Sequence, residues 1–138
     1  MSIQQSLEQK RAAKAWEFVE EISSASDSDL KKKYSSLARK APADIQTGGL
    51  AQTLAFWTAK STVAEGKPKK AEHIAHEKLL GHISKWVKSD DSMKLSQENF
   101  LDWLIKTATT SQYRRATTEA LAFLVWVKRF AEAKLPQE

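Results

Sequence analysis

The fold is decided by one stretch near the C-terminus, Tyr113-Arg-Arg-Ala-Thr-Thr-Glu-Ala-Leu-Ala-Phe-Leu-Val-Trp-Val-Lys-Arg-Phe-Ala-Glu132. The residues from Ala120 to Val127 are all apolar and include neither Gly nor Pro. A helix that crosses a bilayer needs about 20 apolar residues, so this run is too short to span a membrane. Its length favours a helix buried in a soluble protein over a strand.

On a helix with about 100° between successive residues, the apolar side chains of this stretch fall on one broad face. That predicted core face comprises Tyr113, Ala116, Ala120, Phe123, Leu124, Val127, Phe130 and Ala131. The basic residues Arg114, Arg115 and Arg129 fall on the opposite side. Since further apolar residues flank both faces, we expect other helices to pack against this one.

The composition limits the fold class and the possible partners. A chain of 138 residues fits one domain, residues 1–138, which can bury about two thirds of its unfolded surface. Without cysteine it has no disulfide and no Cys-based zinc site, which suits a cytoplasmic protein. The N-terminus lacks the apolar core of a signal peptide, and we expect no membrane span. The 22 Lys and Arg exceed the 17 Asp and Glu, and this net charge of +5 permits a polyanionic partner.

The remaining segments predict helices and no strands, because none of them alternates in polarity over a strand's length. The expected fold is therefore all-α, a single compact bundle of five or six helices. The first helix covers about Ile3 to Ile22, with Leu7 in its apolar stripe. The second starts from an N-cap at Ser26 or Asp27 and reaches about residue 40.

Pro42 is expected to end the second helix or to start a short one, and Gly48-Gly49 follows as a break. A third helix covers residues 49–60. Its predicted inner face consists of Leu50, Ala51, Leu54, Ala55 and Thr58. A fourth helix covers about residues 68–88.

The fifth helix is expected to begin after an N-cap at Ser96, where Leu95 would pack on Phe100. Residues 109–111, Thr-Thr-Ser, break this helix and cap the last one.

Arg11 projects into the apolar stripe of the first helix, and Lys14 lies at its edge. An arginine in this position can form an ion pair where two helices cross. Alternatively, this face of the helix contacts another subunit or RNA. Trp16 projects from the opposite, polar side, as expected for a contact surface or for a helix buried on two sides.

All three histidines lie in the fourth helix. His73 and His76 are three residues apart, so both can reach one metal ion, but His-Ile-Ala-His-Glu matches neither zinc-protease pattern. Two histidines without a third ligand are a weak metal signal, so we expect no metal site. His82 falls near the apolar face and is expected to be a hydrogen-bonded packing residue.

Motifs of enzymes are missing from this sequence. It has no Gly-x-Ser-x-Gly elbow and no glycine-rich dinucleotide loop, and neither Gly48-Gly49 nor Gly66-Lys67 fits a phosphate-binding loop. We therefore expect no catalytic centre, no cofactor and no small-molecule substrate.

Two long motifs carry a resemblance to a known family. Gly49-Leu-Ala-Gln-Thr-Leu-Ala-Phe56, followed by the stretch from Tyr113 to Ala133, resembles the small all-helical subunit of the type III-B CRISPR effector, the Cmr complex. Glu8-Gln-Lys-Arg-Ala-Ala-Lys-Ala15 fits the same family. Ala51 stands where many relatives are expected to have a glycine, a change that a helix tolerates.

The resemblance implies a non-catalytic role. Copies of such a subunit stack into a short filament beside the backbone of RAMP subunits that hold the CRISPR RNA. The target RNA, paired with the guide, lies in the channel between the two filaments. The partners implied are therefore the RAMP backbone subunits, the large subunit, further copies of the chain, CRISPR RNA and target RNA.

The residues expected to contact RNA or a partner are Arg11, Lys14, Gln52, Arg114, Arg115, Lys128 and Arg129. Of these, Arg115 and Arg129 are expected to share one outward surface. Two other functional classes stay open: a free-standing basic helical RNA-binding domain, and a metal-dependent nuclease that uses His73 and His76.

Overall fold

The computed structural model describes residues 5–90 and 99–138, and within them the chain forms six α-helices and no strand. The helices are α1 (Leu7–Ser23), α2 (Ser28–Gly48), α3 (Leu50–Ser61), α4 (Ala71–Lys88), α5 (Phe100–Lys106) and α6 (Thr110–Lys134). The all-α prediction is confirmed. Among the described residues, no helix combines the length and the apolar character that a membrane span requires.

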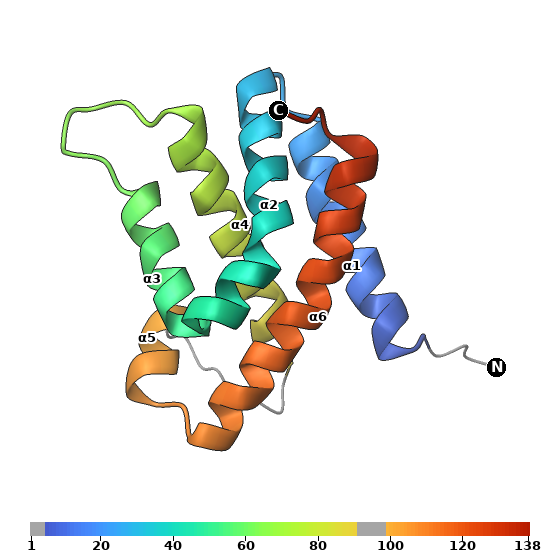
Figure 1. The fold of residues 1–138 in the computed structure, drawn as a ribbon, viewed down its shortest axis with the longest axis vertical. Coiled ribbons are helices and arrows are strands. Elements are labelled where there is room, and N and C mark those ends of the chain that lie inside the picture. The colour runs from blue at the N-terminus through green and yellow to red at the C-terminus, as the bar shows by residue number, and fades with distance from the viewer. Residues whose placement is uncertain (1–4, 91–98) are drawn as a thin grey trace.

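The long helices pack around one hydrophobic core (Figure 1). α6 packs along α1 and also contacts α2 and α4, while α4 packs on both α2 and α3. The short α5 covers one end of α3. The first and last helices of the chain therefore lie side by side.

The caps explain where several helices begin. The Asp27 carboxylate accepts the backbone N–H groups of Asp29 and Leu30 and so starts α2, as predicted. Thr109 and Gln112 form a reciprocal capping box that starts α6, which confirms the predicted break.

The predicted cap of the fifth helix is wrong. Asn99 is the N-cap of α5, and its side chain accepts the N–H groups of Leu101 and Asp102. Ser96 and Leu95, which were expected to form the cap and its apolar contact, lie outside the described residues.

The prediction that Pro42 ends the second helix or starts a short one is also wrong, because α2 continues through Pro42 to Gly48. Proline lacks an N–H group, so the carbonyl of Ala38 loses its intrahelical donor, at a cost of about 3 kcal/mol. Ala41 and Ile45, on either side of the proline, are fully buried, and their burial offsets this cost. In Figure 1, α2 changes direction in its last turns before α3, as a proline kink would produce.

The inner face of α3 differs from the prediction. Leu50 and Leu54 are buried as expected, but Ala55 and Thr58 are exposed and Trp57 is buried instead. The helix is rotated toward its largest side chain, because burying an indole removes far more apolar area than burying an alanine.

Leu7 is likewise not part of the core, since 52% of it is exposed. It is the first residue of α1, and in Figure 1 this end of the helix extends beyond the bundle.

The predicted core face of α6 is confirmed. Its buried residues are Ala116, Ala120, Phe123, Leu124, Val127 and Ala131. Tyr113 and Phe130 are partly buried at the edges of this face. Tyr113 also accepts the backbone N–H of Ala51 through its hydroxyl at 2.9 Å, which fixes the start of α3 against α6.

We predict that Leu124→Ala lowers the free energy of unfolding by about 2–5 kcal/mol, because the fully buried leucine leaves a cavity at the centre of α6. Chemical denaturation measures the loss. Val125→Ala is the matched control, since the next residue is 47% exposed and should change stability by no more than about 0.5 kcal/mol. Equal losses in the two variants would contradict the assigned orientation of α6.

Candidate interaction surface

One side of α6 is exposed to solvent in its N-terminal and its C-terminal half and carries most of the positive charge of the helix. We call this side the outward α6 face, and it consists of the exposed residues Arg114, Arg115, Thr118, Val125, Lys128 and Arg129. The period of 3.6 residues places these positions together, because the opposite positions are occupied by the core residues. The basic residues predicted for this side of the helix are thus brought together as expected.

The cations on the outward α6 face differ in their surroundings. Arg115 forms an ion pair with Asp90 at 3.1 Å and so ties α6 to the end of α4. Within the described residues, Arg114, Lys128 and Arg129 form no ion pair. These three side chains therefore keep their charge available for a ligand or a partner.

Arg11 does not lie on this surface. Its guanidinium donates through Nε and one terminal nitrogen to the two carboxylate oxygens of Glu119, at 2.6 and 2.9 Å. Only 16% of the Arg11 side chain and 12% of the Glu119 side chain are exposed. The alternative of an ion-paired arginine at a helix crossing is therefore confirmed.

Glu119 is the common acceptor at this crossing. Besides the two bonds from Arg11, it accepts a hydrogen bond from the indole N–H of Trp86 in α4 at 2.9 Å. The hydrogen bond from Arg11 holds the pKa of the Glu119 carboxyl below its usual range, and the same bond raises the pKa of Arg11. One carboxylate therefore joins α1, α4 and α6.

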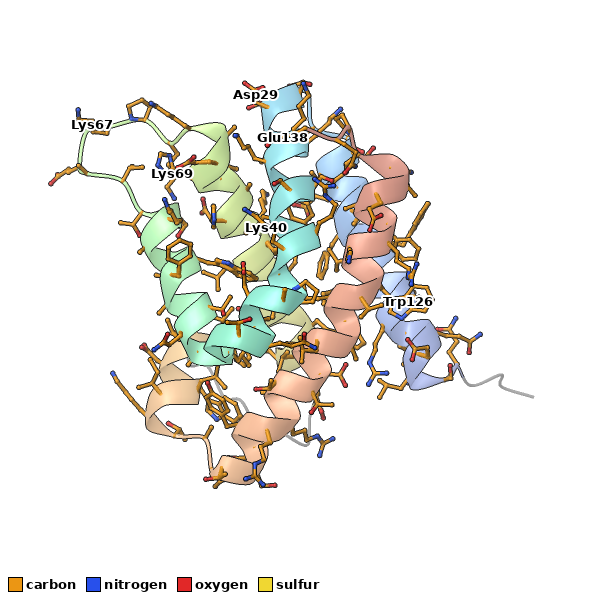
Figure 2. The ribbon with its side chains drawn as sticks, viewed as in Figure 1. Asp29, Lys40, Lys67, Lys69, Trp126 and Glu138 are labelled. Carbon is orange, nitrogen blue, oxygen red and sulfur yellow. The ribbon has the colours of Figure 1, made fainter. Side chains whose placement is uncertain are left out.

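Further contacts extend the junction between α1 and α6, and we call this junction the seam. The indole N–H of Trp126, which Figure 2 labels at the boundary of the two helices, donates to Glu8. Trp16 packs edge-to-face on Phe130, with ring centroids 5.0 Å apart. The Lys134 ammonium lies 4.5 Å from the Trp16 ring centroid and pairs with Glu20. Trp16 thus contacts α6 with part of its ring, although it projects from the polar side of α1.

The other two predicted contact residues lie elsewhere. Lys14 is at the surface of α1, 3.4 Å from the Glu17 carboxylate and over the Phe18 ring. Gln52 is exposed on α3, beside a surface hollow that it lines together with Asp44 and Phe56. Neither residue belongs to the outward α6 face.

The histidines do not form a recognisable metal site in the described part of the chain, where no group of three potential ligands is close enough to share an ion. His73 accepts the backbone N–H of Lys70 through Nδ1, and Nδ1 of His76 bonds the carbonyl of Glu72. A carbonyl can only accept, so Nδ1 of His76 carries a proton.

His82 is a buried packing residue, as predicted, and only 2% of it is exposed. Its ring stacks on Phe18, its Nδ1 lies 2.8 Å from the Tyr34 hydroxyl and its Nε2 lies 3.4 Å from Glu21. Burial lowers the pKa of His82 to about 4. We assign the proton of the neutral ring to Nε2, because the other tautomer would place a lone pair against the Glu21 carboxylate.

One feature of this surface has no signal in the sequence. Pro42 of α2 and Val125 of α6 line a hollow of about 380 Å³ together with Lys128, Arg129 and Glu132. Pro42 and Val125 come close only because the two helices pack together, so the sequence does not show that they line one hollow.

Comparison with known proteins identifies relatives across nearly the whole chain. The family model described as CRISPR-associated protein (Cas_Cmr5) matches residues 7–134. The "CRISPR system Cmr subunit Cmr5" of Thermus thermophilus is 30% identical over 126 residues, which cover 91% of this chain and 93% of that protein. The crystal structure of a CRISPR-associated Cmr5 family protein from Thermus thermophilus superposes with a TM-score of 0.72 at 27% identity. The superposition covers 96% of this chain and 100% of the other.

The contacts of Glu119 lead to a prediction about stability. Glu119→Ala leaves the Trp86 indole without its acceptor and the Arg11 guanidinium with only its 3.5 Å contact to Glu8, so we expect a loss of about 1–3 kcal/mol in the free energy of unfolding. Glu17→Ala is the matched control. The Glu17 side chain is 66% exposed and pairs with Lys14 at the surface, so its loss should cost no more than about 0.5 kcal/mol. Similar losses in the two variants in urea denaturation would show that the seam does not depend on Glu119.

Proposed function

The chain belongs to the Cas_Cmr5 family of CRISPR-associated proteins, and on that basis we propose that it is a non-catalytic structural subunit of a type III-B CRISPR RNA-guided effector complex. In this role, copies of the chain stack into the small-subunit filament. They help to hold the channel that contains the guide and the target RNA. The partners are the other Cmr subunits, CRISPR RNA and target RNA.

The observation that carries the RNA-binding part of this proposal is the outward α6 face. Arg114, Lys128 and Arg129 extend from one rigid helix and form no ion pair among the described residues. Such cations bind phosphates without reading bases, whereas base pairing with the guide supplies sequence specificity. A buried core face and a basic outer face on the same helix suit a scaffold that touches an RNA backbone.

The same cations also suit carboxylates of a neighbouring subunit. The two possibilities differ in their dependence on salt. Each lost phosphate contact reduces the salt slope of RNA binding by about one unit, whereas a lost protein contact reduces assembly first.

We predict that replacing Arg114 and Arg129 with Glu leaves the fold intact but weakens incorporation into the complex or its affinity for target RNA. Both side chains are exposed, so circular dichroism should be unchanged. Reconstitution with the other subunits, followed by measurement of target-RNA affinity at two salt concentrations, distinguishes the two routes. Arg115 is left in place because its reversal would set a second carboxylate beside Asp90.

The matched control replaces Lys60 of α3 and Lys106 of α5 with Glu. This pair is also exposed and changes the net charge by the same amount, but it lies off the outward α6 face. If the α6 variant assembles and binds RNA like the parent, the outward α6 face is only a solvated helix surface. If both pairs weaken binding equally, the effect belongs to the net charge and not to this face.

We also predict that the purified protein leaves labelled RNA intact in the presence of magnesium, manganese or zinc. The reason is that the proposed role is structural and that both histidines of the nuclease alternative engage neighbouring backbone groups through Nδ1. Gel electrophoresis of the RNA is the measurement. Reproducible cleavage that His76→Ala abolishes would overturn the structural role and support a metal-dependent nuclease.

A further inference from the structure

A notch lies between α2 and α6, beside the proline kink of α2. Its volume is about 380 Å³, and it is lined by Pro42, Val125, Lys128, Arg129 and Glu132. Val125 is 47% exposed there, which makes it one of the few large apolar side chains that the fold leaves open to solvent. The notch occupies the C-terminal half of the outward α6 face.

The notch is lined by both apolar and charged side chains. The Pro42 ring and the Val125 methyl groups offer aliphatic surface, while Lys128 and Arg129 lie exposed and form no ion pair among the described residues. Glu132 supplies a single opposing charge. An apolar centre with a charged rim is the arrangement found in protein–protein interfaces.

A phosphodiester backbone would use the two cations, but its charged, hydrated sugar-phosphate surface has no aliphatic side chain that could fill the space beside Pro42 and Val125. A protein segment with an aliphatic side chain next to a carboxylate complements both the apolar centre and the cations of the notch. The aliphatic group would fill the notch, and the carboxylate would pair with Lys128 or Arg129. The lining therefore favours a protein over RNA as the occupant.

We propose that this notch receives an aliphatic side chain of an adjoining protein subunit, with an acidic residue beside it held by Lys128 or Arg129. The inference rests on the proposed function, because it requires the chain to work within a multi-subunit complex. The inference also assigns the two halves of the outward α6 face to different ligands, the C-terminal half to a protein and the N-terminal half to RNA. Arg114 lies about 20 Å along the helix from Arg129, given a rise of 1.5 Å per residue, so the N-terminal half stays accessible to RNA.

The test uses two substitutions of Val125 in complexes reconstituted from all Cmr subunits and CRISPR RNA. Val125→Asp places a carboxylate where the aliphatic group would sit, and Val125→Trp fills the notch. Each should raise the concentration needed for half-maximal incorporation by at least about tenfold, as expected for the loss of a central interface contact. Both variants should keep the circular dichroism spectrum and thermal unfolding of the parent, because the position is exposed.

Thr118→Asp is the matched control. It adds the same charge to an exposed position on the same helix face, two turns from Val125 and outside the notch. We expect this variant to incorporate like the parent. Loss of incorporation in both Val125 variants, but not in Thr118→Asp, supports docking of a subunit in the notch.

Three results would overturn the inference. The first is normal incorporation of both Val125 variants. The second is normal incorporation with a lower, more salt-sensitive affinity for target RNA, which would make RNA the occupant of the notch. The third is an equal loss in Thr118→Asp, which would show that any added acid on this face is harmful. If the parent chain itself stays out of the complex, the proposed function fails, and the docking of a subunit fails with it.

Discussion

A single carboxylate accepts hydrogen bonds from two other helices where α1, α4 and α6 meet, and the arrangement of the bundle depends on it. Glu119 accepts hydrogen bonds from Nε and one terminal nitrogen of the Arg11 guanidinium and from the indole N–H of Trp86. Shifting α1 by one residue would turn Arg11 by about 100° away from its acceptor. The bidentate Arg11–Glu119 pair therefore fixes the register of α1 on α6. Both charges are largely removed from water, so the loss of either one leaves the other incompletely paired.

With α1 held in that register, α6 has two distinct sides. Its inner side places Phe123 and Leu124 in the core, and its outer side presents the cations Arg114, Lys128 and Arg129 to solvent. A helix anchored along its whole length by core contacts keeps its outer charges at fixed spacings. Charges held at fixed spacings need less ordering on binding, whether the ligand is a row of phosphates or a protein.

Periodicity within one helix is a local property, and the features that depend on it could be predicted. The core face of α6 and the outward position of Arg115 and Arg129 follow from the 3.6-residue period alone. Features that depend on a distant partner could not be predicted. The acceptor of Arg11 is 108 residues away, and α2 continues through Pro42 because tertiary burial of Ile45 offsets the lost hydrogen bond. In α3 the predicted inner face was partly wrong, because alanine and threonine give the helix no strongly apolar side and the burial of Trp57 sets its orientation.

The pairing of the first helix with the last has a consequence for synthesis on the ribosome. At about 5–20 residues per second, the synthesis of α1 is complete roughly 5 to 20 seconds before Glu119 is made. During that interval the apolar stripe of α1 lacks α6, the helix on which it mainly packs, and exposed apolar surface makes a nascent chain prone to aggregate. The Arg11 guanidinium lies about one turn before the buried stripe, and its charge stays in water until its acceptor emerges. A residue that specifies the register of the finished bundle therefore also adds a charge beside the exposed apolar stripe of the unfinished chain.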